Sequence, residues 1–291
     1  MQFSKGHGTE NDFVVLPDPD GVLDLTPARV AALCDRRRGL GADGVLRVVR
    51  WAALGDGPEP EPGVEWFMDY RNADGTVAEM CGNGVRVFAR YLEHAGWLTG
   101  GETPLGTRAG VRTVRLEPRD GTDGDVSVDM GPAVVGETST ASIHGEAFPG
   151  VAVDVGNPHL ACVTGVAIDG LDLTCPPGHD PALFPHGVNV EFVSPVSTAG
   201  GHAEIAMRVH ERGVGETRSC GTGTVAAVVA ALRHAGRSGG TVAVQTRGGR
   251  LRVTVDGSAT VLHGPAVLVA HGELTRSWWD AAAREPASVG C

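Results

Sequence analysis

The sequence of 291 residues contains no apolar run near the roughly 20 residues that span a bilayer. Its first eight residues lack the basic segment followed by an apolar segment that marks a signal peptide. There is also no basic stripe, because 24 Lys and Arg stand against 35 Asp and Glu, for a net charge of -11. These absences argue against a membrane protein and against binding of nucleic acid or anionic membrane. We therefore expect a cytoplasmic enzyme.

The cysteines lack the spacing of a metal site or a disulfide scaffold. No pair has C-x-x-C spacing, and six cysteines are few for a chain of this length. His159, Cys162 and Cys175 lie near one another in the sequence without the paired-ligand spacing of a zinc site, so no metal is expected.

Four of the six cysteines have ordinary surroundings. Cys34 lies in a predicted helix and Cys162 in a predicted strand, where a thiol behaves as a small buried hydrophobic side chain. Cys175 precedes two prolines in a loop, and Cys291 is the last residue of the sequence.

The other two, Cys81 and Cys220, lie in matched settings. Each is followed by a Gly-x-Gly turn and then by a run with helical character, 139 positions apart (81 to 220). Asn72 precedes the first cysteine by nine residues, and Glu211 precedes the second by nine. Such a repeat predicts a duplicated chain with one active site built from two related halves.

The predicted elements are short strands and three helices, at about 26–37, 84–95 and 220–235. They indicate an α+β fold of two pseudo-symmetric halves, each a strand-rich mixed or antiparallel sheet around one central helix, with the active site in the cleft between them. The polar loop at 118–125 predicts a boundary near the middle of the chain. We expect one half at 1–125, with a C-terminal segment of about 273–291, and the other at 126–272.

The position of the two cysteines predicts proton chemistry. A thiol at the start of a helix is next to the positive end of the helix dipole, which lowers the thiol pKa. Backbone N–H groups at Gly82, Asn83, Gly221 and Thr222 would hold the carboxylate of an α-amino acid. One sulfur, as thiolate, could then remove the α-proton while the other, as thiol, donates a proton to the opposite face.

Two other interpretations of these motifs are weaker. One Cys-Gly-x-Gly segment alone would indicate a tight turn with a buried thiol, but two copies in a duplicated frame favour function. Residues 221–226 also fit a dinucleotide-binding glycine pattern, yet the acidic residue about 20 positions later in a βαβ frame is missing. We reject that match.

The chain resembles the diaminopimelate epimerase family over nearly its full length. The motifs that carry the resemblance follow the order of that family: Gly8-Thr9-Glu10-Asn11-Asp12-Phe13, Asn72-Ala73-Asp74-Gly75, Met80-Cys81-Gly82-Asn83-Gly84, Gly156-Asn157-Pro158-His159, Asn189-Val190-Glu191-Phe192, Glu211-Arg212-Gly213-Val214-Gly215-Glu216-Thr217 and Cys220-Gly221-Thr222-Gly223. The resemblance implies a cofactor-independent isomerase that converts LL- to meso-diaminopimelate in lysine and peptidoglycan precursor synthesis. It also implies a homodimer.

The resemblance also implies a role for each site residue. Cys81 and Cys220 would be the acid–base pair, Glu211 would meet the reacting amino group, and His159 would adjust polarity beside the reaction centre. The remaining residues would bind the substrate, including its distal end: Asn11, Asn72, Asn157, Asn189 and Arg212. One departure is Gly44, where many relatives carry glutamine, so that contact would be absent or supplied by water.

Two alternatives remain open. A proline racemase-like enzyme would use the same pair of thiols, but its first motif usually has histidine where this chain has Asn83. The asparagines and Arg212 also suit a substrate that is charged at both ends. A thiol redox sensor, in which Cys81 and Cys220 form a reversible disulfide, belongs to a different class.

Overall fold

The computed structural model describes residues 1–98, 100–117, 124–198 and 201–283. It divides the chain into two compact units: unit 1, Met1–Val126 with Ala266–Cys291, and unit 2, Ser127–Pro265. Strand β17 (Val267–Glu273) belongs to unit 1 because it pairs with β1 (Gln2–Gly8), whereas the sequence assigned most of it to the second half. Positions 118–123 of the predicted boundary loop and Cys291 lie outside the described residues.

Unit 1 is a seven-stranded run of neighbouring strands. Along it, the pairings are antiparallel, antiparallel, parallel, antiparallel, parallel and antiparallel. The strands follow in the order β17, β1, β2 (Asn11–Pro17), β3 (Gly44–Arg50), β4 (Trp66–Asn72), β5 (Glu102–Thr107) and β6 (Gly110–Leu116).

Unit 2 repeats that series of pairings. Its strands follow in the order β8 (Val134–Ile143), β9 (Glu146–Asp154), β10 (Pro158–Val163), β11 (Asn189–Val193), β12 (Glu204–Glu211), β14 (Gly240–Thr246) and β15 (Gly249–Asp256). The pairings are again antiparallel, antiparallel, parallel, antiparallel, parallel and antiparallel. The short β13 (Gly215–Thr217) also pairs with β12, and β16 (Ala259–Pro265) pairs with β15 and with β7 (Asp125–Pro132).

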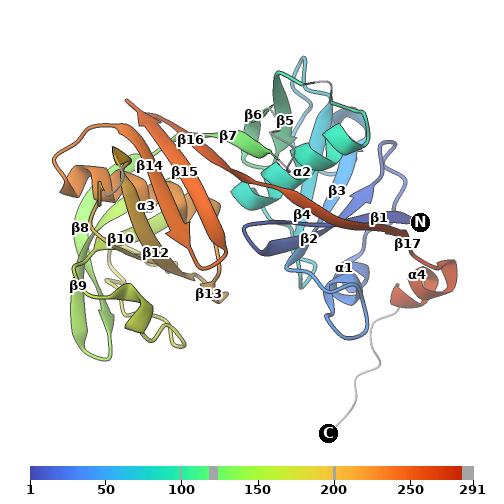
Figure 1. The fold of residues 1–291 in the computed structure, drawn as a ribbon. Helices are drawn as coiled ribbons and strands as arrows, with labels where there is room; N and C mark the ends of the chain where they lie inside the picture. The colour runs from blue at the N-terminus through green and yellow to red at the C-terminus, as the bar shows by residue number, and fades with distance from the viewer. Residues whose placement is uncertain (99, 118–123, 199–200, 284–291) are drawn as a thin grey trace, which may run out of the picture. The chain divides into compact units, whose positions relative to one another are not determined.

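One main helix occupies the same place in the strand order of each unit. Helix α2 (Gly82–His94) connects β4 to β5, and helix α3 (Gly221–His234) connects β12 to β14. Both connect parallel neighbours, which require a crossover of this kind. The predicted α+β fold of two pseudo-symmetric halves, each with a strand-rich mixed sheet and one central helix, is therefore confirmed (Figure 1).

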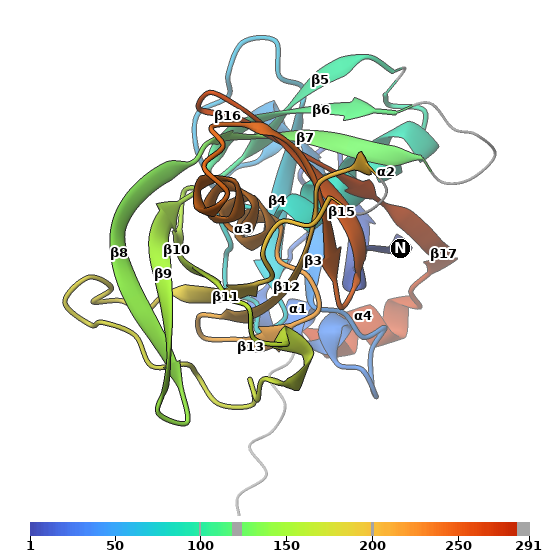
Figure 2. The ribbon, with the colours of Figure 1, turned by 60° about the vertical axis from the view of Figure 1, so that its left-hand side comes forward.

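The two main helices are buried in their own units. Helix α3 is apolar on all sides, as predicted, and it packs against β9, β10, β11, β12 and β15 (Figure 2). Helix α2 packs against β1, β2, β6 and β17, and it buries two arginines, Arg86 and Arg90, among its apolar residues. A buried guanidinium requires hydrogen-bond partners, and one set of them lies at the site described below.

Some predicted bounds were wrong. Strand β1 continues to Gly8, and the turn that follows is confined to Thr9 and Glu10, both at positive φ. The first helix, α1 (Pro27–Cys34), begins at the Thr26 cap as predicted but ends before Arg37, where Asp35 takes an extended conformation. Five elements were not predicted: β5, β8, β13, β16 and α4 (Arg276–Ala282). The structure also has two short 3-10 helices, at Trp51–Ala53 and Ile168–Gly170.

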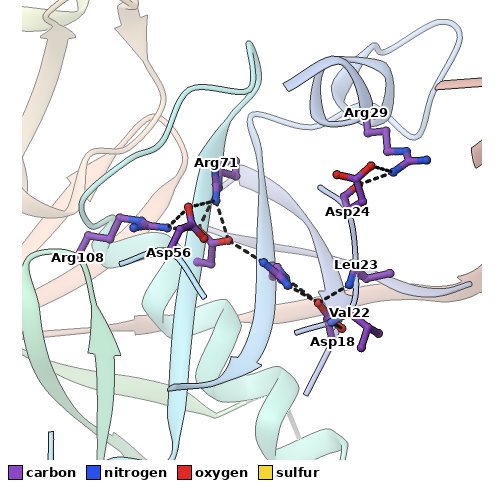
Figure 3. A network of polar contacts seen from close by, with 10 residues as sticks. Asp18, Val22, Leu23, Asp24, Arg29, Asp56, Arg71 and Arg108 are labelled. Atoms are coloured by element: carbon purple, nitrogen blue, oxygen red, sulfur yellow. Dashed lines mark hydrogen bonds and ion pairs between the residues drawn. The ribbon is translucent and has the colours of Figure 1, made fainter. Parts of the chain in front are cut away.

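A network of charged side chains fixes β3 against β4 in unit 1. Asp69 is fully buried and accepts from Arg71 at 3.0 Å and from Arg108 at 2.9 Å. Arg47, on the neighbouring strand, pairs with Asp18 at 2.6 Å. Figure 3 shows Asp18 at one end of this network and Arg71 and Arg108 at the other. Removing one partner would leave a buried charge uncompensated, so the network holds the strand that ends at Asn72 in a single register.

Candidate active site

In unit 1, Cys81 caps the start of helix α2. Its backbone is extended (φ -139°, ψ 119°), and its carbonyl accepts the first helical hydrogen bond from Val85 at 2.8 Å. The glycine and asparagine that follow form the first turn, so their N–H groups lie at the positive end of the helix dipole. Cys81 is half-buried.

Asn11 connects this helix start to the sheet. Its Oδ1 accepts from Cys81 Sγ at 3.5 Å and from Asn83 Nδ2 at 3.2 Å. Its Nδ2 donates to Asp43 Oδ2 at 2.7 Å. Three of the predicted residues of this half, Asn11, Cys81 and Asn83, are therefore brought together.

Arg86 lies fully buried one turn further along α2. It donates to Asn83 Oδ1 at 2.9 Å and to Thr9 Oγ1 at 3.2 Å, and burial lowers its pKa to about 10. Because Asn83 Oδ1 accepts from the arginine, its Nδ2 is the end that faces Asn11. The buried cation thus sets the orientation of two amides beside the thiol.

Asn72 is the last residue of β4, and its Nδ2 donates to Thr76 Oγ1 at 3.0 Å within the following turn. It pairs across the strands with Gly44, the residue that departs from the family pattern. A Cβ at Gly44 would lie 2.6 Å from the Arg71 carbonyl oxygen and 2.7 Å from Tyr70 Cε2. The Tyr70 ring occupies the space in which a longer side chain would start, so glycine is required here.

In unit 2, Cys220 caps helix α3 in the same way. Its backbone is extended (φ -122°, ψ 121°), and its carbonyl accepts from the Thr224 amide at 2.9 Å and from Thr224 Oγ1 at 2.6 Å. Its sulfur accepts from the Gly223 amide at 3.4 Å and lies 3.6 Å from Thr222 Oγ1. The sulfur of Cys220 is thus turned back over the start of its own helix.

The prediction that the helix end lowers the thiol pKa is wrong for Cys220. Burial raises its pKa well above the ordinary value, and the negative charges of Glu211 and Glu191 raise it further. The hydrogen bonds from Thr222 and Gly223 act in the opposite direction but are outweighed. The helix dipole is a local effect, whereas burial between two carboxylates comes from the tertiary structure.

His159 lies at the centre of a short buried chain of side chains. Its Nδ1 is 2.7 Å from Glu191 Oε1, and its Nε2 is 2.9 Å from Asn157 Oδ1. His159 and Glu191 are both fully buried, on the neighbouring parallel strands β10 and β11. Burial raises the pKa of Glu191, although the histidine lowers it.

The other predicted residues of this half lie at the ends of the same strands. Asn189 begins β11, where its Nδ2 donates to the Pro158 carbonyl at 3.0 Å and its Oδ1 accepts from the Arg212 amide at 2.9 Å. Glu211 ends β12 and accepts from Thr217 Oγ1. The Arg212 guanidinium donates to the His186 carbonyl at 3.2 Å.

Two residues of these clusters were not predicted. Asp43 lies outside every motif that carries the family resemblance, and Glu191 lies in the motif at 189–192, where polar and apolar residues alternate, without a predicted role of its own. That alternation predicts that one face of the strand is exposed, but all five residues of β11 are buried. The motif itself contains no histidine, so the pairing of Glu191 with His159 depends on the neighbouring strand β10.

The remaining described cysteines differ in burial. Cys34 and Cys162 are buried, as predicted, and burial raises the pKa of each to about 12. Cys175 is exposed. Within the described ranges, no group of three or more His, Cys, Asp or Glu is placed to hold a metal ion. In the same part of the chain, no helix is long and apolar enough to cross a membrane.

The fold is shared with solved structures of low sequence identity. A phenazine biosynthesis protein of the PhzF family from Bacillus anthracis has a TM-score of 0.71 at 14% identity, covering 94% of this chain and 99% of the other. A hydroxyproline epimerase from Agrobacterium vitis has a TM-score of 0.67 at 16% identity, covering 98% of each chain. The chain thus has the two-half α+β fold that includes epimerases of amino acids.

Sequence comparison identifies the family within that fold. The model described as diaminopimelate epimerase matches residues 3–136 and 151–269. Diaminopimelate epimerase of Rhodococcus erythropolis is 57% identical over 290 residues, 96% of this chain and 98% of that protein. The enzyme of Mycolicibacterium smegmatis is 57% identical over 294 residues, 97% of this chain and all of that protein. The chain belongs to the diaminopimelate epimerase family and is an isomerase.

Proposed function

We propose that this protein epimerises LL-2,6-diaminopimelate to meso-diaminopimelate by proton transfer between two cysteines. The observation that carries the proposal is the repeated geometry: Cys81 and Cys220 each cap the main helix of a unit with the same series of strand pairings. The relatives that are 57% identical over nearly the whole chain bear this activity in their names.

In the proposed mechanism, both sulfurs act on the same reacting carbon of the substrate. One cysteine, as thiolate, takes the α-proton, and the other, as thiol, gives a proton to the opposite face of the carbanion. The helix-start amides of Gly82, Asn83, Gly221 and Thr222 hold the α-carboxylate, which accumulates charge as the proton leaves. Only protein groups act, so no cofactor takes part.

The remaining roles are those that the resemblance to the family implies. Glu211 accepts a hydrogen bond from the α-amino group, and His159 adjusts the polarity beside the reaction centre. The asparagines Asn11, Asn72, Asn157 and Asn189, together with Arg212, bind the rest of the substrate. The arginine would pair with a carboxylate.

The test is exchange of the α-hydrogen in heavy water. The protein should introduce deuterium into LL- and meso-diaminopimelate without added pyridoxal phosphate. Cys81→Ala and Cys220→Ala should each lose epimerisation, whereas Cys175→Ala, at an exposed cysteine, should keep it. Full activity in either of the first two variants would contradict the two-base mechanism.

The same assay separates the alternatives. Exchange into proline but not into diaminopimelate would favour a proline racemase-like activity. A redox sensor would instead form a Cys81–Cys220 disulfide reversibly and show no exchange in the reduced state. All five cysteines within the described residues are free thiols.

We further propose a cytoplasmic homodimer. The proposed chemistry requires two reduced thiols, which persist in the reducing cytosol. The dimer rests on the resemblance to the family. Light scattering would test it, and the mass of a single chain at micromolar concentration would contradict it.

A further inference from the structure

Glu191 has a place in the structure that none of the proposed roles uses. It is fully buried in the middle of β11, and its Oε1 is bonded to His159 Nδ1 at 2.7 Å. Its second oxygen, Oε2, is buried without a hydrogen-bond partner. A buried carboxylate with one unpaired oxygen is costly to retain for packing alone.

The contacts of His159 determine where its protons lie. Asn157 Oδ1 can only accept, so His159 Nε2 carries a hydrogen and donates it over 2.9 Å. Nδ1 then either carries a second proton and donates to a Glu191 carboxylate, or is unprotonated and accepts a hydrogen bond from a Glu191 carboxylic acid. In both cases one proton is shared between Nδ1 and Oε1, and the buried pair is neutral.

The carboxyl group of Glu191 also lies against the start of α3. A Cβ built on Gly223 would be 2.6 Å from Glu191 Oε1 and 3.3 Å from Cys220 Sγ. The glutamate therefore fills the space between the histidine and the first turn behind Cys220. The absence of a side chain at Gly223 makes that position possible.

From this geometry we infer that Glu191 is a positioning residue that holds His159 with a proton on Nε2 and so fixes the amide of Asn157. With its Oδ1 bonded to the histidine, Asn157 presents Nδ2 as a donor to an anionic group of the substrate. Glu191 does not touch the substrate. It acts through His159, and the inference rests on the proposed function of the site.

Nitrogen NMR of histidine-labelled protein tests the first step without activity. The resonances of His159, identified by their loss in His159→Gln, should show a protonated Nε2 in the unmodified protein. Nε2 should remain protonated in Glu191→Gln, whose amide can donate to an unprotonated Nδ1. In Glu191→Ala, the proton of the His159 ring should no longer be confined to Nε2. The ring should exchange between its two tautomers, so that the shifts of the two nitrogens are averaged. Identical His159 shifts in the unmodified protein and in Glu191→Ala would overturn the inference.

Kinetics test the second step. Glu191→Ala should lower kcat/KM by about 10- to 100-fold, as the loss of a partner that orients a functional histidine does elsewhere. Glu191→Gln should recover most of that loss. On a His159→Gln background, Glu191→Ala should have little further effect, because both variants break the same chain. Additive losses would show a role in packing only and would overturn the inference.

Two controls complete the design. The first control is Glu204→Gln. Glu204 lies on the neighbouring strand β12 and forms a partly exposed ion pair with Arg250, so this change should leave kcat/KM and the His159 shifts unchanged. If Glu191→Ala does not fold, Glu191→Asp replaces it, since its shorter side chain cannot reach Nδ1, and the same outcomes apply. Absence of exchange in the unmodified protein would refute the proposed function, while the NMR result would still decide the role of Glu191.

Discussion

The amide of Asn11 is oriented by Asp43. Asn11 Nδ2 donates to Asp43 Oδ2 at 2.7 Å, so its Oδ1 is the atom that faces Cys81 Sγ at 3.5 Å. Asp43 is held in turn by Arg36 at 2.7 Å. A turn residue outside the predicted site thus determines whether the thiol meets an acceptor or a donor.

We expect Asp43→Ala to lower kcat/KM for epimerisation by about tenfold, since a hydrogen bond to a charged group contributes about 1.5–3 kcal/mol. Without Asp43, the Asn11 amide keeps only the bond from Asn83 Nδ2, so its Oδ1 is held less firmly toward Cys81. Asp43→Asn retains an acceptor and should recover most of the activity. Asp20→Ala, which removes an exposed partner of Arg50, is the control. An unchanged kcat/KM in Asp43→Ala would count against this orientation.

The two helix-start glycines should respond differently to substitution. Alanine is favoured over glycine in a helix by about 1 kcal/mol. However, a Cβ at Gly223 would lie 2.6 Å from Glu191 Oε1, while a Cβ at Gly84 would meet nothing closer than Leu46 Cδ2 at 3.3 Å. Gly223→Ala should therefore destabilise the protein by about 1–3 kcal/mol in urea unfolding, whereas Gly84→Ala should change little. Equal losses at both positions would contradict the close approach of Glu191.

Glutamine at position 44, which the family resemblance implies there, should be harmful. Gly44→Gln places a Cβ against the backbone of Arg71 and the ring of Tyr70, so we expect a lower midpoint of thermal unfolding and less activity. The matched control is Gly165→Gln, at an exposed glycine with open space around its Cβ position. A gain of activity in Gly44→Gln would show that the site had lost a useful contact and could regain it.

The Cys220 thiol should react only at alkaline pH. Because burial and the charges of Glu211 and Glu191 raise its pKa, the thiolate fraction is small at neutral pH and grows as pH rises. Iodoacetamide labelling, followed peptide by peptide with mass spectrometry, should still accelerate above pH 9. In Glu211→Gln, the acceleration should begin at lower pH.

The same shift has a consequence for stability. The thiol of the unfolded chain ionises near pH 8.5, while the native pKa is higher. The native state therefore gains free energy of unfolding below that pH, and this contribution is lost as the pH rises toward the native pKa. Labelling of native Cys220 that reached a plateau below pH 8 would show that the helix end outweighs burial.

Local signals account for what the sequence predicted. A cysteine followed by Gly-x-Gly and an apolar helix can be recognised without tertiary contacts, and its repetition gave the duplicated frame. Glu191 could not be predicted, because its role depends on a strand buried on both faces and on the missing side chain of Gly223. The raised pKa of Cys220 likewise depends on carboxylates from two strands, β11 and β12. Strand β8 pairs with β9, which follows it in the chain, and the sequence of β8 carries little alternation.

Because β1 pairs with β17, the sheet of unit 1 can be completed only after unit 2 has been synthesised. Unit 2 is one continuous segment, whereas the sheet of unit 1 requires residues 267–273 beside residues 2–7. Since chains fold as they emerge from the ribosome, unit 2 can be complete while unit 1 still lacks an edge strand. A chain that stops at Pro265 should therefore show a protease-resistant unit 2 and a cleavable N-terminal segment. Equal resistance of both would show that unit 1 closes without its last strand.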